Sequence, residues 1–154
     1  MGEDQVIAVN RKAFHDYLIQ ERMECGLVLT GTEIKSIRLG GVSLQQAYAG
    51  PDNGALWLFD VHIALFEAGG RYNHDPKRPR KLLLHKREMN RVMGSVARKG
   101  YTLVPLSLYL KHGLAKVELG LAQSKKQYDK RKALAEKDAR RETERALKTK
   151  VGRR

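Results

Sequence analysis

Two apolar runs, 101–110 and 114–121, flank the polar tripeptide Lys111-His112-Gly113. In the second run, apolar residues occupy every other position: Ala115, Val117, Leu119 and Leu121. Such alternation is typical of a strand with one buried and one solvent-facing side, and a glycine in a short polar link is typical of a hairpin turn. The pattern therefore predicts a long antiparallel hairpin.

Longer apolar runs at 17–29, 42–49 and 55–63 predict further strands, and short ones lie at 6–9 and 82–84. Gly26 indicates a bulge or a close approach of the backbone to another residue. Five or six strands with long hairpins predict a mainly β fold, a small closed antiparallel barrel of the oligonucleotide-binding (OB) type with two or three short helices. A four-stranded RNA-binding sheet is the alternative, although its aromatic strand signature is missing.

Helical patterns occur in three places. Asn10 stands where a cap would precede a short helix over 11–14, and the apolar pair Ile34 and Ile37 indicates a helix of one to two turns. Residues 88–99 carry apolar side chains at helical spacing, which predicts the most regular of these helices. The charged side chains of the middle helix are expected to point away from the core: Glu33, Lys35 and Arg38.

The last thirty-two residues differ from the rest in charge. They carry 13 Lys and Arg against 5 Asp and Glu, a net charge of +8, whereas residues 1–122 contribute +5 to the total of +13. Acid-to-base pairs four residues apart stabilise an isolated helix by only about 0.2 to 0.5 kcal/mol each, and this segment has few apolar side chains. We therefore expect a barrel domain, 1–122, and a basic tail, 123–154, that is disordered when free and helical on a polyanionic partner. A merely solubilising tail is the alternative.

Two clusters of basic residues lie on the expected barrel domain. One is the segment 71–87, which holds seven Lys and Arg, a single acid and a proline-bounded loop. The other combines Lys35 and Arg38 with Arg11 and Lys12. Each cluster alone fits an ordinary solvated surface, but together with the tail they produce a broad positive field that attracts a phosphate backbone. A nucleic acid is the predicted partner.

Several other classes of function are disfavoured. The chain has one cysteine, Cys25, so an intramolecular disulfide is excluded, and no stretch approaches the roughly 18 apolar residues of a membrane span. The first twenty residues lack the features of a signal peptide, so we expect a cytoplasmic protein. The five histidines lack metal-ligand spacing and no nucleophile or phosphate-binding motif occurs, so we expect no metal, no cofactor and no enzyme. A nuclease that uses Glu24, Glu33 or Glu118 as an acid is the alternative.

Blocks of residues along most of the chain resemble the SmpB family, the SsrA-binding proteins that accompany transfer-messenger RNA (tmRNA) in bacterial ribosome rescue. The resemblance runs from the first apolar run to about residue 131 without a large gap. Its blocks are Asn10-Arg11-Lys12 with His15 and Tyr17, ECGL (24–27), GTEIKSIR (31–38), DPKRPRKLLLHKRE (75–88), GYTLVPLSLYLK (100–111), AKVELGLA (115–122) and KKQYDKR (125–131). Several such blocks in order are far more specific than any one of them.

The resemblance implies an OB-type barrel that grips the tRNA-like part of tmRNA and stands in for the missing anticodon arm. It implies an RNA-binding set on the barrel domain: Asn10, Arg11, Lys12, Glu24, Lys35, Arg38, Arg78, Arg80, Lys81, Leu83 and Lys116. The chemistry is compatible, because basic side chains hold phosphates, Asn10 and Glu24 can bond 2′-hydroxyls and base edges, and Leu83 can pack on an unstacked base.

The resemblance also assigns the tail to the ribosome. Tyr128 falls where the family places a ring that stacks in the empty decoding centre, and the tail would lie as a helix in the vacant messenger channel. The implied tail set is Lys125, Lys126, Tyr128, Asp129, Lys130, Arg131, Ala146, Leu147 and Lys148. Two departures from the family pattern occur: Gln123-Ser124 replaces a glycine before the paired lysines, and Ala146-Leu147-Lys148 replaces a bulkier Ile-Met-Lys element.

The partners implied by the resemblance are tmRNA and the ribosome, with elongation factor Tu and alanyl-tRNA synthetase reached through the RNA. The chain is expected to act as a monomer. A general chaperone of structured or single-stranded RNA with the same fold is the alternative function.

Overall fold

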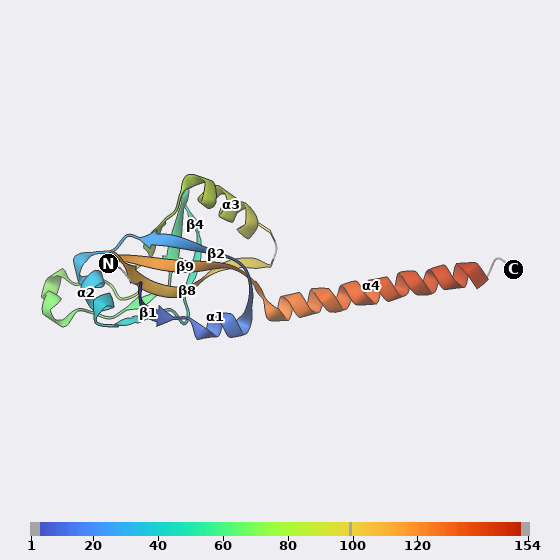
Figure 1. The fold of residues 1–154 in the computed structure, drawn as a ribbon, viewed down its shortest axis with the longest axis horizontal. Coiled ribbons are helices and arrows are strands. Elements are labelled where there is room, and N and C mark those ends of the chain that lie inside the picture. The colour runs from blue at the N-terminus through green and yellow to red at the C-terminus, as the bar shows by residue number, and fades with distance from the viewer. Residues whose placement is uncertain (1–3, 99, 152–154) are drawn as a thin grey trace.

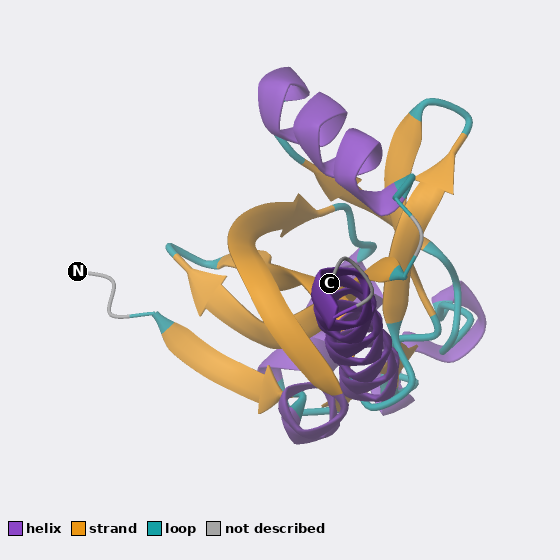
Figure 2. Cartoon of the chain, turned by 90° about the vertical axis from the view of Figure 1, so that its right-hand side faces the viewer, coloured by secondary structure: helices purple, strands orange, loops and turns teal. Residues whose placement is uncertain are grey.

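The computed structural model describes residues 4–98 and 100–151, and the centre of this part is a closed barrel of six antiparallel strands (Figures 1 and 2). The strands follow one another in the order β8-β4-β5-β7-β2-β9, and β9 pairs back with β8. They are β2 (Tyr17–Leu27), β4 (Tyr48–Asp52), β5 (Ala55–Phe59), β7 (Arg80–Leu83), β8 (Tyr101–Lys111) and β9 (Leu114–Ser124). The predicted small closed antiparallel barrel is confirmed, and closure satisfies the sheet edges that an open sheet would expose.

Shorter elements surround the barrel. β1 (Gln5–Val9) pairs with β8, and β3 (Val42–Ser43) pairs with β6 (His62–Ile63) as a separate two-stranded ladder. The helices are α1 (Arg11–Asp16), α2 (Gly31–Arg38), α3 (Lys86–Val96) and α4 (Lys125–Val151), together with a 3₁₀ segment, η1 (Glu67–Tyr72). α2 lies at one end of the molecule, and α4 leaves the barrel at the opposite end (Figure 1).

The predicted hairpin is confirmed in β8 and β9. Its turn is one residue shorter than the polar tripeptide, because only His112 and Gly113 separate the paired residues Lys111 and Leu114. Both turn residues have a positive φ, 51° and 76°, which is the geometry that matches the twist of two tightly linked strands. This turn therefore fixes the register of the pairs along the hairpin.

Side-chain caps begin α1 and α2. The predicted cap at α1 is confirmed, because Asn10 Oδ1 accepts a hydrogen bond from the Ala13 amide at 3.2 Å. α2 begins with a capping box, in which Thr30 and Glu33 each accept the other's backbone N–H. The box turns the Glu33 side chain into the protein, where it is 0% exposed, so the expectation that Glu33 points outward is wrong. Lys35 is exposed, as expected, and so is Arg38.

Several predicted boundaries are wrong. The apolar run 55–63 is divided between β5 (Ala55–Phe59) and β6 (His62–Ile63), because Asp60 between them has a positive φ of 59°. The apolar run 42–49 is not one strand, because a turn at 44–47, in which the Ala47 amide bonds the Leu44 carbonyl at 3.0 Å, buries both of these side chains. The helix predicted at 88–99 begins earlier, at Lys86, and ends at Val96. Lys99 itself lies outside the described residues.

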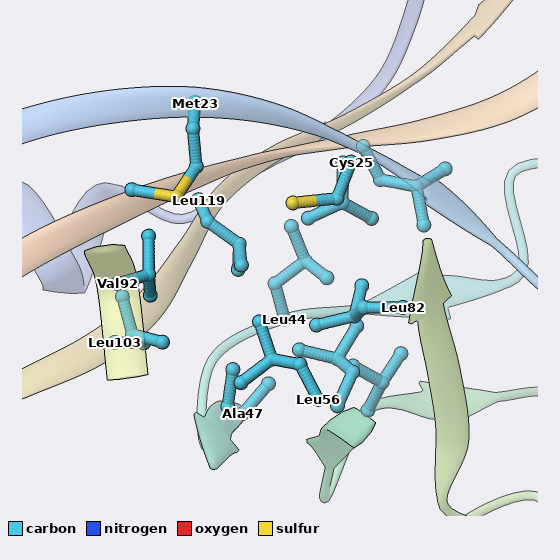
Figure 3. Packing of buried hydrophobic residues seen from close by; sticks show 14 of the residues in the cluster. Met23, Cys25, Leu44, Ala47, Leu56, Leu82, Val92, Leu103 and Leu119 are labelled. Atoms are coloured by element: carbon cyan, nitrogen blue, oxygen red, sulfur yellow. The ribbon is translucent and has the colours of Figure 1, made fainter. Parts of the chain in front are cut away.

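The barrel interior holds one apolar core (Figure 3). Alternate residues of the strands point into it, among them Cys25 on β2, Leu82 on β7 and Leu119 on β9, each with 0% exposure. Burial raises the pKa of the Cys25 thiol to about 12, so this cysteine stays protonated and packs as a small apolar side chain.

A second, smaller apolar cluster lies between the barrel and α1. It consists of Ala13, Val104, Leu106 and Ala122. Because this cluster adds to the core on the other face, the second half of β9 is buried on both sides. The predicted solvent-facing side of the hairpin is therefore confined to the first half of β9 and to the residues of β8 that pair with it.

α4 is a single helix of 27 residues that projects away from the barrel, about 40 Å long at roughly 1.5 Å per residue (Figure 1). Its described side chains from Lys126 to Lys148 are all exposed. Neither apolar cluster includes a described residue of α4, so the barrel packs without it. Among the described residues, no helix combines the length and the apolar character needed to span a membrane.

Candidate nucleic-acid interface

A row of four residues crosses the outer face of the barrel from β7 to β8. Leu83 pairs with Gly26, Gly26 with Lys116, and Lys116 with Tyr109. Because successive side chains of a strand point to opposite faces, these residues belong to the outer face, where Tyr109 is covered to 8% exposure, while their neighbours in sequence fill the core. With two further residues beside the row they form what we call the barrel-face site: Glu24, Gly26, Leu83, Tyr109, Lys111 and Lys116.

Gly26 forms the floor of the barrel-face site. A Cβ atom at this position would lie 3.2 Å from Leu83 Cβ and 3.7 Å from Lys116 Nζ. The predicted close approach at Gly26 is therefore confirmed, whereas the bulge of β2 lies elsewhere, between Ile19 and Glu21. The missing side chain lets Leu83, which is 51% exposed, and the Lys116 ammonium group present an apolar surface and a cation together.

Tyr109 and Lys111 hold the carboxylate of Glu24. The Tyr109 hydroxyl donates a short hydrogen bond to Glu24 Oε2, and Lys111 Nζ lies 3.5 Å from the same oxygen. The bond from Tyr109 and the nearby ammonium groups hold the pKa of Glu24 below its usual range, while burial and the same bond raise the pKa of Tyr109. An ionised carboxylate only accepts hydrogen bonds, so Glu24 selects ligands that present O–H or N–H groups and not phosphates.

Arg80, which the resemblance places in the RNA-binding set, faces the other way. Along β7 the side chains of Arg80 and Leu82 are buried, and those of Lys81 and Leu83 are exposed. Arg80 is 0% exposed, so its guanidinium cannot reach a phosphate outside the protein in this arrangement. Of the three residues of β7 in the expected RNA-binding set, Lys81 and Leu83 are therefore open to a ligand and Arg80 is not.

Arg80 pairs with Glu33 beneath α2. Its Nε lies 2.5 Å from Glu33 Oε2, and its other nitrogens donate to three backbone carbonyls at 2.7 to 3.2 Å. Arg78 Nη2 donates to the second carboxylate oxygen, also at 2.5 Å. Burial alone opposes ionisation, but the bonds from Arg78, the Thr30 amide and Arg80 hold the pKa of Glu33 below its usual range. This network fastens α2 to the segment that leads into β7.

Asn10 is also inside the protein, at 4% exposure. Its Nδ2 donates to the carbonyls of Leu44 and Pro105 at 3.2 and 2.9 Å, while its Oδ1 caps α1. Every polar atom of this side chain thus has a partner within the protein, and its direct role is to fasten α1 to the barrel. The neighbouring Arg11 and Lys12 are exposed.

Further cations of the RNA-binding set lie on and beside α2. Lys35 and Arg38 are exposed, and the Lys35 ammonium group lies 5.5 Å from the centre of the Phe66 ring. Arg78 is half-buried because of its bond to Glu33. The network under α2 thus carries a second basic surface on its outer side.

The start of α4 contacts α1. Lys125 Nζ donates to the Phe14 carbonyl at 3.2 Å. A groove at this junction is lined by His15, Asp16, Tyr17, Ser124, Lys125 and Lys126. A hydrogen bond from His15 and the nearby charges of Lys12 and Lys126 hold the pKa of Asp16 below its usual range. The junction therefore keeps an ionised acid among cations.

The remaining residues of the tail set are spread along α4. Tyr128 is 41% exposed and Leu147 is 59% exposed. Also exposed are Lys126, Asp129, Lys130, Arg131, Ala146 and Lys148. The barrel-face site and the tail set are thus separate surfaces, and the structure does not bring them together.

Three members of the barrel-face site are absent from the sequence-based RNA-binding set. One is Gly26, which the sequence marked only as a close approach of the backbone, and the others are Tyr109 and Lys111. The signal for Tyr109 and Lys111 is the hairpin register, because a two-residue turn at His112 and Gly113 places Tyr109 opposite Lys116. A two-residue hairpin turn of the type seen here needs a positive φ at both positions, and a His-Gly pair adopts it more readily than most. Placing the turn on these two residues would have added Tyr109 to the site.

The described residues, 4–98 and 100–151, contain no group of three His, Cys, Asp or Glu side chains placed to hold a metal ion. Of the acids considered for a nuclease, Glu24 and Glu33 have a lowered pKa, and Glu118 accepts a bond from Arg22 at 3.3 Å. A general acid needs a raised pKa to hold its proton at neutral pH. The geometry therefore gives the nuclease alternative no support.

Comparison with known proteins extends the likeness over nearly the whole chain. The family described as "SmpB protein" matches residues 7–149. The SsrA-binding protein of Roseiflexus castenholzii is 60% identical over 148 residues, which cover 96% of this chain and 94% of that protein. The SsrA-binding protein of Carboxydothermus hydrogenoformans is 57% identical over 145 residues, which cover 94% of this chain and 97% of that protein.

A solved structure shares the fold. It is described as "tmRNA-SmpB: a journey to the center of the bacterial ribosome", and its chain is 50% identical with a TM-score of 0.65. The match covers 77% of this chain and 83% of that one. Sequence and fold thus point to the same group of proteins.

Proposed function

Because the chain belongs to the SmpB family, we propose that it is a non-enzymatic adaptor that binds the tRNA-like part of tmRNA and acts with it in ribosome rescue. In this role the protein completes a tRNA shape by standing in for the missing anticodon arm. The role makes and breaks no covalent bond. Its chemistry is the recognition of phosphates, 2′-hydroxyls and bases.

The observation that carries the proposal is the presence of two cationic surfaces of different construction. The barrel-face site holds Lys116 and Lys111 on paired strands beside an ionised carboxylate and an exposed leucine. α4 holds its cations on a helix whose described side chains beyond Lys125 are exposed. The first construction suits a folded RNA of defined shape, and the second suits a channel lined with phosphates.

On the barrel we assign direct RNA contacts to the exposed members of the set and to half-buried Lys116 and Arg78. Lysines and arginines hold phosphates, Glu24 accepts from 2′-hydroxyls or base amino groups, and Leu83 packs on an unstacked base. The assigned contacts are Arg11, Lys12, Glu24, Lys35, Arg38, Arg78, Lys81, Leu83 and Lys116. Arg80 and Asn10 act indirectly, by holding α2 and α1 in place.

We assign α4 to the ribosome. Tyr128 is proposed to stack in the empty decoding centre, with Lys125, Lys126, Lys130 and Arg131 on ribosomal RNA phosphates and the rest of the helix in the vacant messenger channel. Helix stability without tertiary packing rests on side-chain pairs that contribute only about 0.2 to 0.5 kcal/mol each. We therefore propose that this segment is largely disordered when free and forms a complete helix against RNA.

The remaining partners follow from the bound RNA. Elongation factor Tu and alanyl-tRNA synthetase are proposed to meet the protein through tmRNA and not through a dedicated protein surface. The protein is proposed to act as a monomer in the cytoplasm.

Truncation after Ser124 tests the division of labour, because this cut keeps the whole of β9. The shortened chain is expected to retain most of its affinity for tmRNA in filter binding and to lose peptide tagging on stalled ribosomes. The matched full-length variant Tyr128→Ala should likewise impair tagging more than RNA binding, since stacking contributes about 1 to 3 kcal/mol per base. Loss of both functions in the truncated chain would contradict the division.

Competition separates the adaptor from a general RNA chaperone. Labelled tmRNA is bound to the full-length protein and challenged with bulk tRNA or with an unstructured RNA of equal length. The adaptor requires that both competitors be much weaker than unlabelled tmRNA. Equal potency would favour the chaperone.

A further inference from the structure

The loop 66–73, which we call the tip loop, is closed at its base by one side chain. Asn73 Oδ1 accepts from the Phe66 amide at 3.1 Å, and Asn73 Nδ2 donates to the Phe66 carbonyl at 2.6 Å. Within the loop, the Gly69 amide bonds the Phe66 carbonyl at 2.8 Å, and Gly70 has a φ of 51°. The Asn73 side chain thus bonds both backbone groups of Phe66, as a residue on a neighbouring strand would. These bonds join the two ends of the loop and restrict the conformation of residues 67–72 between them.

The tip loop is also fastened to α2. His74 follows it at 8% exposure, with Nδ1 2.9 Å from Thr32 Oγ1 and Nε2 2.9 Å from the Ile63 carbonyl oxygen. Gly69 lies so close to α2 that a Cβ atom there would be 2.9 Å from Thr32 Cγ2. The loop therefore stands on α2 as a rigid extension, at the end of the molecule opposite to α4 (Figure 1).

This rigid loop presents an aromatic ring and cations to solvent. Tyr72 is 76% exposed, and the Arg71 guanidinium lies 5.0 Å from the centre of its ring and donates to its hydroxyl at 3.0 Å. Lys35 and Arg38 project from the adjoining helix. The tip loop thus holds the Tyr72 ring in solvent beside cations. An apolar face of this ring has no partner among the described residues.

The chemistry of this surface fits an unpaired nucleotide. A base can stack on the open face of an aromatic ring, and arginine and lysine beside the ring can hold the flanking phosphates. The only acid within the loop is Glu67, so the surface is complementary in charge to a polyanion.

We propose that the tip loop is a further RNA contact, in which an unpaired base of the bound RNA stacks on Tyr72 while Arg71 and Lys35 hold the adjoining phosphates. The inference rests on the proposed function, because the RNA in question is tmRNA. It adds a stacking site to a set of contacts that otherwise consists mainly of phosphate and hydroxyl recognition. The site extends the basic surface of α2 away from the barrel.

The test uses the full-length protein and a transcript of the tRNA-like part of tmRNA. Tyr72→Ala is expected to weaken binding by about 5- to 150-fold, which corresponds to the roughly 1 to 3 kcal/mol of one stacked base, with the salt dependence unchanged. Arg71→Ala is expected to reduce the salt slope by about 0.7, the value for one single-strand phosphate. Tyr48→Ala, which removes an exposed ring stacked on Phe59 of β5, is the matched control and should leave affinity unchanged.

A fluorescence measurement shows the stacking itself. In a Trp57→Phe background, Tyr72→Trp places the only tryptophan of the chain in the tip loop, and RNA binding is expected to quench it. Wild-type affinity of Tyr72→Ala for the RNA, or an unquenched tryptophan in the complex, would overturn the inference while the proposed function stands. Failure of the wild-type protein to bind the transcript would instead refute the proposed function. Normal RNA binding by Tyr72→Ala with loss of a protein partner would make the tip loop a protein contact and refute the RNA assignment.

Discussion

The barrel and α4 both carry many cationic side chains, but the barrel-face site holds its cations on paired strands beside an ionised carboxylate, whereas the described cations of α4 beyond Lys125 are exposed on a projecting helix. On the barrel, Lys111 lies beside a carboxylate and Lys116 beside a glycine floor, in a register fixed by a tight turn. Fixed groups bind a ligand of matching shape at a low cost in conformational entropy, whereas exposed flexible ones bind any polyanion. Net charge therefore says how strongly each region attracts RNA and nothing about which RNA it selects.

The largest expected difference between the two regions concerns a buried acid. Glu33→Ala leaves Arg80 charged and unpaired under α2, so we expect a loss of about 3 to 5 kcal/mol in the free energy of unfolding. The matched change on α4, Glu136→Ala, removes an exposed carboxylate and should alter stability by less than about 0.5 kcal/mol. Urea unfolding of both variants measures the contrast. Equal effects would mean that the network under α2 contributes no more than a surface pair.

The same acid gives the barrel a pH dependence. The pKa of Glu33 in the folded protein lies below its ordinary value of 4.5, so the unfolded chain takes up the proton more readily than the folded one. The contribution to stability is therefore complete well above pH 4.5 and is lost as the pH falls through the lower, folded value. In urea unfolding at several pH values, the stability difference between wild type and Glu33→Gln should be largest near neutrality and shrink in acid. A difference that grows in acid would show that the sign of the shift is wrong.

A smaller effect is expected at the barrel-face site. A hydrogen bond to a charged group contributes about 1.5 to 3 kcal/mol, and we expect Tyr109→Phe to cost about 1 kcal/mol in tmRNA affinity, roughly fivefold, because Glu24 loses its fixed orientation. In a Glu24→Ala background the same change should have no further effect. Tyr101→Phe, on the same strand, is the control. An equal loss in both backgrounds would show that the Tyr109 hydroxyl contributes to binding independently of Glu24.

The floor of the barrel-face site should tolerate substitution less well than an open position. Gly26→Ala places a methyl group 3.2 Å from Leu83 Cβ, so Leu83 must shift, and we expect a loss of about 1 kcal/mol in tmRNA affinity. Gly94→Ala on α3, where the added Cβ would meet no atom within 4 Å apart from its chain neighbours and the adjacent backbone of its own helix, is the matched control and should leave affinity unchanged. Filter binding of both variants provides the comparison. Unchanged affinity in both would mean that Leu83 does not contact the RNA.

The smallest effect is expected on α4. Glu144 and Lys148 are four residues apart and can form an ion pair on the helix. Glu144→Gln should therefore destabilise the helical form of the segment by about 0.2 to 0.5 kcal/mol and lower its helicity. The melting temperature of the barrel should not change. Circular dichroism of the peptide 125–151 measures the first and thermal unfolding of the full chain the second. At about 1 M salt the difference in helicity should vanish. A shift in barrel melting would show that α4 packs on the barrel.

The sequence predicts most clearly those elements whose pattern is local. The β8–β9 hairpin and the cap at Asn10 follow from neighbouring residues, because alternation and capping act over a few positions. The apolar run 42–49 misleads because a turn buries both Leu44 and Ala47, and apolar content alone does not reveal that turn.

The pairing of Glu33 with Arg80 shows what lies beyond such patterns. Alternation within β7, applied to Lys81 and Leu83, already places Arg80 on the core side of the strand. Its partner, however, lies 47 positions away in sequence, and only the packing of α2 on the barrel brings the two together. The direct contacts of the barrel were therefore predictable in part, and the network that positions them was not.

The packing of the barrel without α4 has an evolutionary consequence. Because the two apolar clusters draw on no described residue of this helix, substitutions along it leave the folding of the barrel untouched and are tolerated or rejected through binding alone. Substitutions at positions such as 146–148 are thus expected to be constrained by charge and helix propensity, while the strands that carry Glu24 and Lys116 must satisfy folding and recognition with the same residues.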